Sequence, residues 1–330
     1  MTAGKPDGVS RTGEFEFIAQ SLAPLAAGYE GAFGLTDDAA LLAMSSGLTV
    51  TSDTLVQGVH FRNEDPLDLV ARKALRVNVS DLVAMAAKPH AFLLSIVWPE
   101  TVAADDQMRF VDGLAADAHQ YSMPLIGGDT VRGGDRLVIT ITAFGEVERP
   151  LRRSGARPGD RVFVSGTIGD GWLGLHADDL DLPDPVRNVL KDRYMLPQPP
   201  VALIEALRAT ATAGLDVSDG LAADADHLST TSGAGIDLQL ASVPVSAAAR
   251  QWLVKQANQT DAMVSLITGG DDYEMLFCVA DHQVDQMMSA AIDVRIDVTE
   301  IGLICDGSGV RVFDEKGDIV QILKTGFTHF

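Results

Sequence analysis

The sequence has few cysteines, no long apolar run and a shortage of basic residues. Cys278 and Cys305 allow at most one disulfide bridge and no cysteine-based metal site, which is typical of a reducing cytoplasm. The longest apolar run, Ala91 to Trp98, is interrupted by Ser95 and is far too short to cross a bilayer. Residues 1–13 are small, polar and glycine-rich, so we expect a flexible tail and not a secretory signal. We therefore expect a cytoplasmic protein with no membrane partner.

Acidic residues outnumber basic ones, because the chain has 46 Asp and Glu residues against 25 Lys and Arg residues, for a formal net charge of −21. This charge argues against nucleic acid or an anionic membrane as the main partner. A phosphate-bearing ligand would need divalent cations to offset the repulsion. The length of 330 residues is enough for about two domains that each bury their own core.

The common nucleotide-binding motifs are missing. The sequence contains no Gly-x-x-x-x-Gly-Lys-Ser/Thr loop and no protein-kinase His-Arg-Asp or Asp-Phe-Gly set. The segment Gly169 to Gly174 formally matches Gly-x-Gly-x-x-Gly, but it opens the second half of the chain and is followed by the acidic, loop-like segment 178–185. A dinucleotide site would place this motif in the first βαβ unit, so a turn followed by a helix start is favoured here. The backbone amides of this turn could still contact a phosphate.

Apolar spacing predicts strands and helices in both halves, so we expect a two-domain α/β or α+β fold. The segment from Arg149 to Asp160 is basic, rich in Pro and Gly and without periodicity. It predicts a boundary between an N-terminal domain at 14–148 and a C-terminal domain at 149–330. In the first domain we expect helices at 14–27, 65–87 and 103–121 and strands at 41–44, 48–51, 91–98, 125–128 and 136–146. In the second we expect helices at 200–210, 221–231, 245–257 and 281–291 and strands at 161–165, 236–240, 274–279, 295–304 and 309–313.

Acidic residues recur at the expected ends of strands and helices, beside Gly, Ser or Thr. They are Asp37, Asp38, Asp53, Asp81, Asp129, Asp216, Asp219, Asp271 and Asp272. Any one of them alone is typical of a helix cap or a turn. Together they provide the hard oxygen ligands that Mg²⁺ prefers, and no Cys or His cluster favours a softer metal. Such a site favours phosphoryl transfer, which needs little covalent participation from the protein and fits the absence of an evident nucleophile.

Two further residues each have two interpretations. His60 closely follows Asp53 and is either a structural residue or a ligand contact. Arg153 lies in the predicted linker, where its side chain could reach a nucleotide phosphate or remain a solvated charge.

Eight motifs in this order resemble those of the thiamine-monophosphate kinase family, from about Gly13 to the last residue. They are Thr36-Asp37-Asp38-Ala39, Thr51-Ser52-Asp53-Thr54-Leu55 with Gly58-Val59-His60-Phe61, Asn78-Val79-Ser80-Asp81-Leu82, Ile126-Gly127-Gly128-Asp129-Thr130, Arg153-Ser154-Gly155-Ala156, Asp216-Val217-Ser218-Asp219-Gly220-Leu221, Gly269-Gly270-Asp271-Asp272-Tyr273-Glu274 and Gly326-Phe327-Thr328-His329-Phe330. Each motif is moderately specific, and eight in register are highly specific.

The resemblance implies the fold of aminoimidazole ribonucleotide synthetase, with a homodimer formed through the sheet of the N-terminal domain. It implies direct in-line transfer of the γ-phosphoryl group of ATP to thiamine monophosphate, assisted by several Mg²⁺ ions. The metal ligands it implies are Asp38, Thr51, Ser52, Asp53, Asp81, Asp129, Asp216 and Asp219. The ATP contacts it implies are Gly128, Asp129, Arg153 and Ser218, and the substrate contacts are His60, Asp271 and Phe327.

Three positions depart from the family pattern. Thr36 replaces a glycine, which affects only the shape of that loop. Asp271 replaces a glutamate and reaches about one methylene less toward a substrate. Phe327 replaces a Trp or Tyr and can stack on a thiamine ring but has no polar group, while Thr328 stands where Asp is usual.

Other functions remain alternatives at this point. Another ATP-dependent enzyme of the same superfamily is the main one, because a fold does not determine a function. A selenophosphate synthetase would need a reactive Cys within residues 1–50, and a hydrogenase-maturation relative would need a C-terminal Cys, but this chain has neither. A non-catalytic acidic protein that binds divalent cations would explain the charge, but not the distribution of Asp motifs over both halves.

Overall fold

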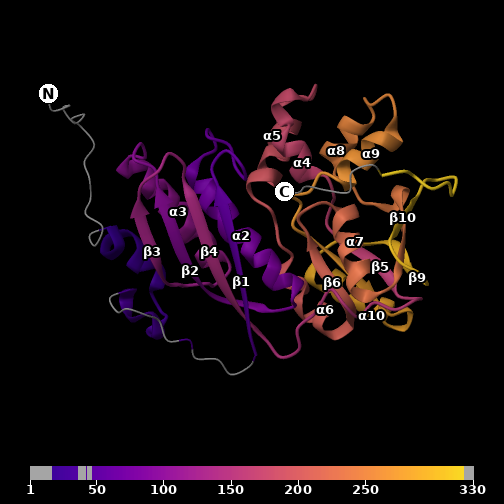
Figure 1. Cartoon of the computed structure of the whole chain (residues 1–330), viewed down its shortest axis with the longest axis horizontal. Coiled ribbons are helices and arrows are strands. Elements are labelled where there is room, and N and C mark those ends of the chain that lie inside the picture. Colours follow the sequence, from indigo (N-terminus) through magenta and orange to yellow (C-terminus); the bar gives the residue numbers. More distant parts are fainter. Residues whose placement is uncertain (1–16, 36–41, 43–46, 323–330) are drawn as a thin grey trace. The chain divides into compact units, whose positions relative to one another are not determined.

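The computed structural model describes residues 17–35, 42 and 47–322, and it divides into two compact units. The first unit contains Val50–Asn78 and Pro89–Gly145, together with the described residues before Ser46. Of the described residues, the second unit contains 47–49, Val79–Lys88 and 146–322. Both units mix strands with helices, which confirms the predicted α/β class (Figure 1). No helix in the described ranges is long and apolar enough to cross a membrane.

The first unit is built on a sheet of four described strands in the order β1-β4-β2-β3. The strands are β1 (Gly47–Val56), β2 (Lys88–Trp98), β3 (Leu125–Arg132) and β4 (Val138–Val147). Helices α2 (Leu67–Ala84) and α3 (Ala104–Gln120) lie beside this sheet (Figure 1). The two helices approach closely at Gly113, where a Cβ would come 2.0 Å from the carbonyl oxygen of Asp68. Short helical turns precede the sheet: η1 (Ile18–Leu22), η2 (Ala23–Ala26) and η3 (Glu30–Leu35).

The second unit is built on a sheet of six described strands in the order β10-β7-β9-β5-β8-β6. The strands are β5 (Arg161–Ser165), β6 (Ala211–Val217), β7 (Gly235–Gln239), β8 (Glu274–Val279), β9 (Val298–Cys305) and β10 (Val310–Phe313). The helices are α4 (Asp170–Leu175), α5 (Asp184–Met195), α6 (Ile204–Thr210), α7 (Leu221–Ser232), α8 (Ala247–Leu253), α9 (Gln259–Ile267) and α10 (Val284–Val294). Short turns are η4 (Ala177–Asp179), η5 (Val201–Leu203), η6 (Leu240–Ser242) and η7 (Asp281–Gln283).

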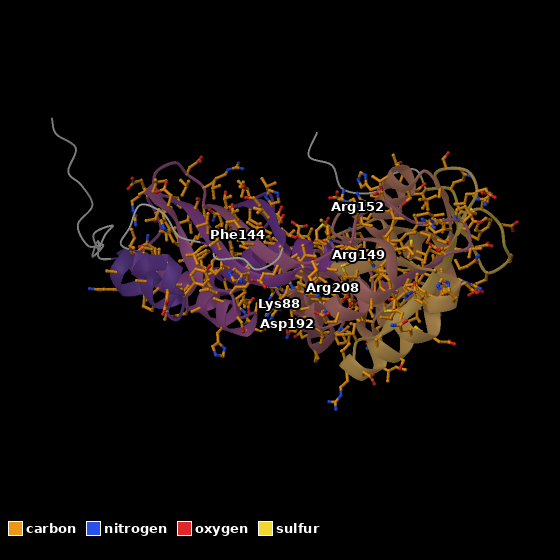
Figure 2. The ribbon with its side chains drawn as sticks, turned by 90° about the horizontal axis from the view of Figure 1, so that it is seen from below. Lys88, Phe144, Arg149, Arg152, Asp192 and Arg208 are labelled. Carbon is orange, nitrogen blue, oxygen red and sulfur yellow. The ribbon has the colours of Figure 1, made fainter. Side chains whose placement is uncertain are left out.

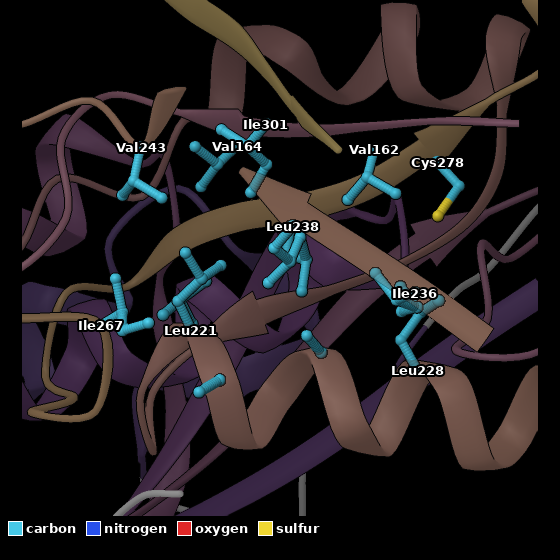
Figure 3. Packing of buried hydrophobic residues seen from close by; sticks show 14 of the residues in the cluster. Val162, Val164, Leu221, Leu228, Ile236, Leu238, Val243, Ile267, Cys278 and Ile301 are labelled. Carbon is cyan, nitrogen blue, oxygen red and sulfur yellow. The ribbon is translucent and has the colours of Figure 1, made fainter. Parts of the chain in front are cut away.

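The main core of the second unit lies between this sheet and α7 (Figure 3). Val162 and Val164 of β5 contribute to it together with Leu221 and Leu228 of α7. Phe163 lies between these two valines in the chain, so its side chain faces the opposite side of the sheet and stacks on Phe277 at 5.7 Å between ring centroids. Phe163 and Phe277 are also buried, so both faces of the sheet are covered at these strands.

The structure corrects several predicted elements. The helix expected at 14–27 is replaced, in its described part, by short turns around Pro24. The helix expected to reach residue 87 ends at Ala84, and β2 already begins at Lys88. Three elements were missing from the prediction, namely β6, α5 and α9, and the segment expected to be a loop up to Pro185 already contains the start of α5. The strand expected at 41–44 falls almost entirely outside the described residues.

Two acidic residues lie within strands and not at their ends. Asp53 was expected to follow a strand that ends at Thr51, but β1 continues to Val56. Asp129 was expected to follow a strand that ends at Gly128, but β3 continues to Arg132. Both are edge strands of the four-stranded sheet, where one face of a strand can carry polar side chains.

Candidate functional site

The loop between β6 and α7 in the second unit carries three of the predicted site residues. Asp216 is buried near the end of β6, and Ser218 and Asp219 follow before α7 begins at Leu221. The hydroxyl of Ser80, which also belongs to the second unit, donates to Asp216 Oδ2 at 2.7 Å. This bond joins Ser80 to the Asp216 motif within the second unit.

Asp224, in the first turn of α7, holds this loop in shape. Its Oδ2 accepts hydrogen bonds from the backbone N–H groups of Ser218 and Asp219, at 3.1 and 3.2 Å. Burial, together with the negative charges of Asp216 and Asp219, raises the pKa of Asp224 to about 8, and the two backbone N–H groups oppose the shift. The repulsion among these carboxylates would be relieved by a bound cation.

One group of side chains in the described residues has the spacing of a metal site. Ligand atoms of Asp219, Asp224 and His227 all lie within 4.8 Å of one another. The carboxylate oxygens fit Mg²⁺, whereas the exposed imidazole nitrogen is not a donor that Mg²⁺ prefers. The sequence analysis did not predict Asp224 or His227 as site residues, although their spacing of three residues on a predicted helix places them on one face.

The segment that carries Asp271 is tied directly to the same loop. The backbone N–H of Asp271 donates to the carbonyl oxygen of Ser218, and that of Tyr273 donates to the carbonyl oxygen of Val217, both at 2.8 Å. Asp271 and Tyr273 have positive φ angles of 67° and 54°, which are unfavourable for residues with a Cβ. Such strain is kept where the surrounding structure determines the backbone closely, and functional sites are a common place for it.

Asp272 follows Asp271 in the chain, and its side chain is buried. It accepts hydrogen bonds from the backbone N–H groups of Gly169 and Gly171 at 2.9–3.1 Å, at the start of α4. Burial raises the pKa of Asp272 well above its usual value, while these two N–H groups oppose the shift. From the sequence, backbone amides of the Gly169–Gly174 turn could have contacted a phosphate. In the structure, the amides of Gly169 and Gly171 in this turn bind the internal carboxylate of Asp272.

The neighbouring Glu274 is also buried and is paired. Arg193 Nη2 donates to Glu274 Oε1 at 2.8 Å, and the hydroxyl of Ser165 donates to Glu274 Oε2 at 2.6 Å. Burial raises the pKa of Glu274, and the positive charge of Arg193 counteracts this shift. Asp272 and Glu274 thus fix both sides of Tyr273 in the second unit.

In the first unit, Ser52 and Asp129 are exposed and Asp53 is half-buried. The Ser52 hydroxyl contacts that of Thr142 at 2.9 Å, and the backbone N–H of Asp53 donates to Asn78 Oδ1 at 3.1 Å. Asp53 on β1 and Asp129 on β3 lie on opposite edges of the sheet. Three strand spacings separate these edges, on the order of 14 Å. A single ion therefore does not join both residues within this unit.

Gly128 and Asp129 border an apolar pocket of about 550 Å³ in the first unit. Leu93, Leu94 and Phe144 contribute to its lining. A Cβ at Gly128 would come 1.8 Å from the carbonyl oxygen of Leu94, so only glycine fits beside β2. The sequence predicted that Gly128 contacts ATP, whereas the close approach seen in the structure is to the backbone of β2, and the pocket was not predicted.

His60 and Arg153 have well-defined surroundings. His60 Nδ1 accepts a hydrogen bond from the backbone N–H of Val56 at 3.0 Å, so a neutral ring carries its proton on Nε2. The carbonyl oxygen of Arg153 accepts hydrogen bonds from the hydroxyls of Thr231 and Ser232 at 3.0 Å, while its side chain is exposed. Both residues therefore have a structural role in addition to the ligand contacts predicted for them.

The remaining predicted residues fall into two groups. Thr51 is half-buried on β1, and Asp81 is half-buried on α2. Asp38 and Phe327 lie outside the described residues.

Comparison with known proteins identifies related sequences along nearly the whole chain. Residues 36–147 match the family described as AIR synthase related protein, N-terminal domain, and residues 157–315 match its C-terminal domain. The thiamine-monophosphate kinase of Caulobacter vibrioides is 42% identical over 321 residues, which cover 96% of this chain and 90% of that protein.

Two solved structures have the same fold. The thiamine-monophosphate kinase of Stenotrophomonas maltophilia K279a is 38% identical, with a TM-score of 0.78 over 87% of this chain and 91% of that one. The structure of AaThiL complexed with AMPPCP and TMP is 32% identical, with a TM-score of 0.77 over 96% of this chain and 97% of that one. At this identity and coverage, the chain belongs to the thiamine-monophosphate kinase family.

Proposed function

We propose that this protein transfers the γ-phosphoryl group of ATP to thiamine monophosphate and releases thiamine diphosphate and ADP. The observation that carries the proposal is the hydrogen bond between Asp271 N–H and the carbonyl oxygen of Ser218. It joins the motif expected to contact the substrate to the motif expected to contact ATP. The similarity to a kinase structure complexed with AMPPCP and TMP supports the same pair of ligands here.

Mg²⁺ ions are part of the proposal, since the available donors are carboxylate and hydroxyl oxygens. The residues proposed to hold them are Asp38, Thr51, Ser52, Asp53, Asp81, Asp129, Asp216 and Asp219, to which the structure adds Asp224 as a neighbour of Asp219. When bound, the ions offset phosphate charge. The loop residues hold their carboxylates in place: Asp224 fixes the backbone of Ser218 and Asp219, and Ser80 orients Asp216.

The protein's own contribution is positioning. Gly128, Arg153 and Ser218 are proposed to contact the nucleotide, and Arg153 and Ser218 supply polar side chains for it. His60, Asp271 and Phe327 are proposed to contact the substrate. No described side chain is arranged as an activated nucleophile, so direct in-line transfer between the two bound phosphates is proposed.

We also propose that the protein acts as a homodimer joined through the sheet of the first unit. Asp53 and Asp129 lie on opposite edges of that sheet, so neither can complete the other's site within one chain. Two copies with joined sheets could bring Asp53 of one copy near Asp129 of the other. Exposed apolar side chains on the edge strands, among them Val50 on β1 and Val131 on β3, are consistent with such a contact.

A coupled assay tests the reaction. The purified protein is incubated with ATP, Mg²⁺ and thiamine monophosphate, and both ADP and thiamine diphosphate are measured. Thiamine and an aminoimidazole precursor serve as control substrates. We expect equal amounts of ADP and thiamine diphosphate with thiamine monophosphate only, and turnover of either control instead would contradict the proposal.

A further inference from the structure

A second pocket in the second unit is rich in arginine and contains none of the residues proposed to bind ATP, metal or substrate. It has a volume of about 810 Å³ and lies around the start of β6 and the end of α6. Its charged lining consists of Arg149, Arg152, Arg157, Arg208, His282 and Asp160, and we call it the arginine pocket. Figure 2 shows Arg149, Arg152 and Arg208 in the same region of the second unit.

The positive charge of the arginine pocket is only partly neutralised. Arg208 Nη1 pairs with Glu205 at 3.1 Å, and its Nε is a buried donor without a partner among the described residues. Arg152 and Arg157 are exposed, and neither side chain forms an ion pair within the described part of the chain. A concentration of four arginines is unexpected in a chain with a net charge of −21.

The single carboxylate of the lining does not balance these arginines by direct pairing. Asp160 is buried, and its Oδ2 accepts hydrogen bonds from the backbone N–H of Arg157 at 3.0 Å and from the hydroxyl of Thr212 at 2.7 Å. Arg149 Nη2 donates to the carbonyl oxygen of Arg208 at 3.3 Å, which holds its guanidinium beside the pocket. Arg208 has its Nη1 and Nη2 groups bound to Glu205 and to the carbonyl oxygen of Ala86. The pocket therefore presents the guanidinium groups of Arg149, Arg152 and Arg157, which keep donors for a ligand, and no free acid.

We propose that the arginine pocket binds a small anion that carries two or more linked phosphate groups. Guanidinium groups bind phosphate oxygens through two parallel hydrogen bonds, and several of them together favour a polyanion over a single phosphate. A volume of about 810 Å³ can hold a ligand as large as a nucleotide. The proposal concerns binding alone and does not depend on the proposed kinase activity.

The pocket is separate from the carboxylate loop. Thr212 lines it at the beginning of β6, whereas Ser218 and Asp219 follow the other end of the same strand. The six residue-to-residue steps from Thr212 to Ser218 span about 20 Å in an extended strand. A ligand in the arginine pocket therefore does not need Mg²⁺ held by Asp219.

Isothermal titration calorimetry with inorganic pyrophosphate, in EDTA and at low ionic strength, tests the proposal on the full chain. EDTA removes Mg²⁺, and low salt preserves charge interactions at the surface. We expect one bound pyrophosphate per chain in the wild-type protein. The double substitution Arg152→Gln with Arg157→Gln should weaken binding by at least about tenfold. Inorganic phosphate should bind more weakly than pyrophosphate.

Two variants serve as controls. Arg187→Gln with Lys191→Gln also removes two positive charges, from ion pairs with Asp184 and Asp178 at the surface of the second unit. Asp219→Asn changes the carboxylate loop. Both should bind pyrophosphate like the wild-type protein. No binding by the wild-type protein, equal losses in both double variants, or a loss confined to Asp219→Asn would each overturn the proposal.

Discussion

The backbone N–H of Asp271 donates to the carbonyl oxygen of Ser218 at 2.8 Å, although these residues are 53 positions apart in the chain. The position of Asp271 therefore depends on two supports, the Ser218 loop on one side and buried Asp272 on the other. Asp272 is bound by the amides of Gly169 and Gly171. Because a displacement of about 1 Å can lower a rate by about a hundredfold, loss of either support should be visible in catalysis.

Asp272→Ala should mainly affect the use of thiamine monophosphate. The substitution leaves two backbone N–H groups at the start of α4 without an acceptor, which costs about 1–3 kcal/mol of unfolding free energy. The released segment would move Asp271, so KM for thiamine monophosphate should rise at least about tenfold, while KM for ATP changes by less than about threefold. Steady-state kinetics with each substrate varied in turn measures both values.

Asp314→Ala is the matched control for this prediction. Asp314 also accepts hydrogen bonds from two backbone N–H groups, those of Lys316 and Asp318, at 2.9 Å each. Its loss should reduce stability with both KM values unchanged. If Asp272→Ala behaved in the same way, Asp272 would be a structural residue without a positioning role.

Asp129→Asn should abolish formation of thiamine diphosphate and leave the fold intact. Asp129 is exposed on an edge strand, so the unfolding free energy should change by no more than about 0.5 kcal/mol. Loss of a charge that holds cations beside phosphate should lower kcat by at least about a hundredfold. The assay is run beside a urea unfolding curve of the same sample. Normal turnover would remove Asp129 from the proposed metal ligands.

Sequence patterns predicted the second unit best where side chains alone determine a strand. The bounds of β5 and β8 were predicted correctly, since both strands contain several consecutive apolar residues that are buried. The strand β6 was missed because Ala211–Val217 contains Ala, Gly and Asp and has little intrinsic strand preference. Its conformation comes from antiparallel pairing with β8, which is a long-range contact that local patterns do not contain.

Some features that the prediction missed could have been found from the sequence, and others could not. The helix α9 follows Asn258, whose side chain accepts from the N–H groups of Thr260 and Asp261, a capping pattern that can be read from sequence. The opposite case is Asp129, whose place within β3 depends on pairing with β2. The candidate carboxylates remain predictions from the sequence, whereas the support of the Asp219 loop by Asp224 required the structure.

Gly128→Ala should strongly destabilise the first unit. Gly128 has a φ of 142°, and a Cβ there would come 1.8 Å from the carbonyl oxygen of Leu94. Strain of this kind costs about 1–3 kcal/mol, and the steric overlap with backbone adds to it. Gly133→Ala is the control, because no atom lies within 4 Å of a Cβ at that position. Urea denaturation that gave equal midpoints for the two variants would contradict the close approach of β3 to β2.

The unfolding free energy of the Tyr121→Phe variant should fall less steeply with rising alkaline pH than that of the wild-type protein. Burial, opposed by the charge of Arg76 and aided by that of Asp117, raises the pKa of Tyr121 from 10.0 to about 12. The unfolded chain would lose this proton at lower pH than the folded chain, so the stabilising contribution is complete below pH 10 and is lost as the pH rises toward 12. The slope is at most about 1.4 kcal/mol per pH unit. Urea unfolding of both proteins from pH 9 to about 11 measures the difference, and parallel curves would show that Tyr121 titrates normally.

Mg²⁺ together with a non-hydrolysable ATP analogue should raise the melting temperature more than either ligand alone. Ligands that bind only the native state stabilise it, by about 2.7 kcal/mol at a hundredfold excess over the dissociation constant. For a chain of this size the shift is about 2–4 °C. The carboxylates around Asp219 repel both phosphate and one another, so the analogue should bind weakly without Mg²⁺. Differential scanning fluorimetry of the wild-type protein and Asp219→Asn measures this dependence. A full shift by the analogue in EDTA would mean that the nucleotide binds without the acidic loop, and the proposed role of Asp219 would be wrong.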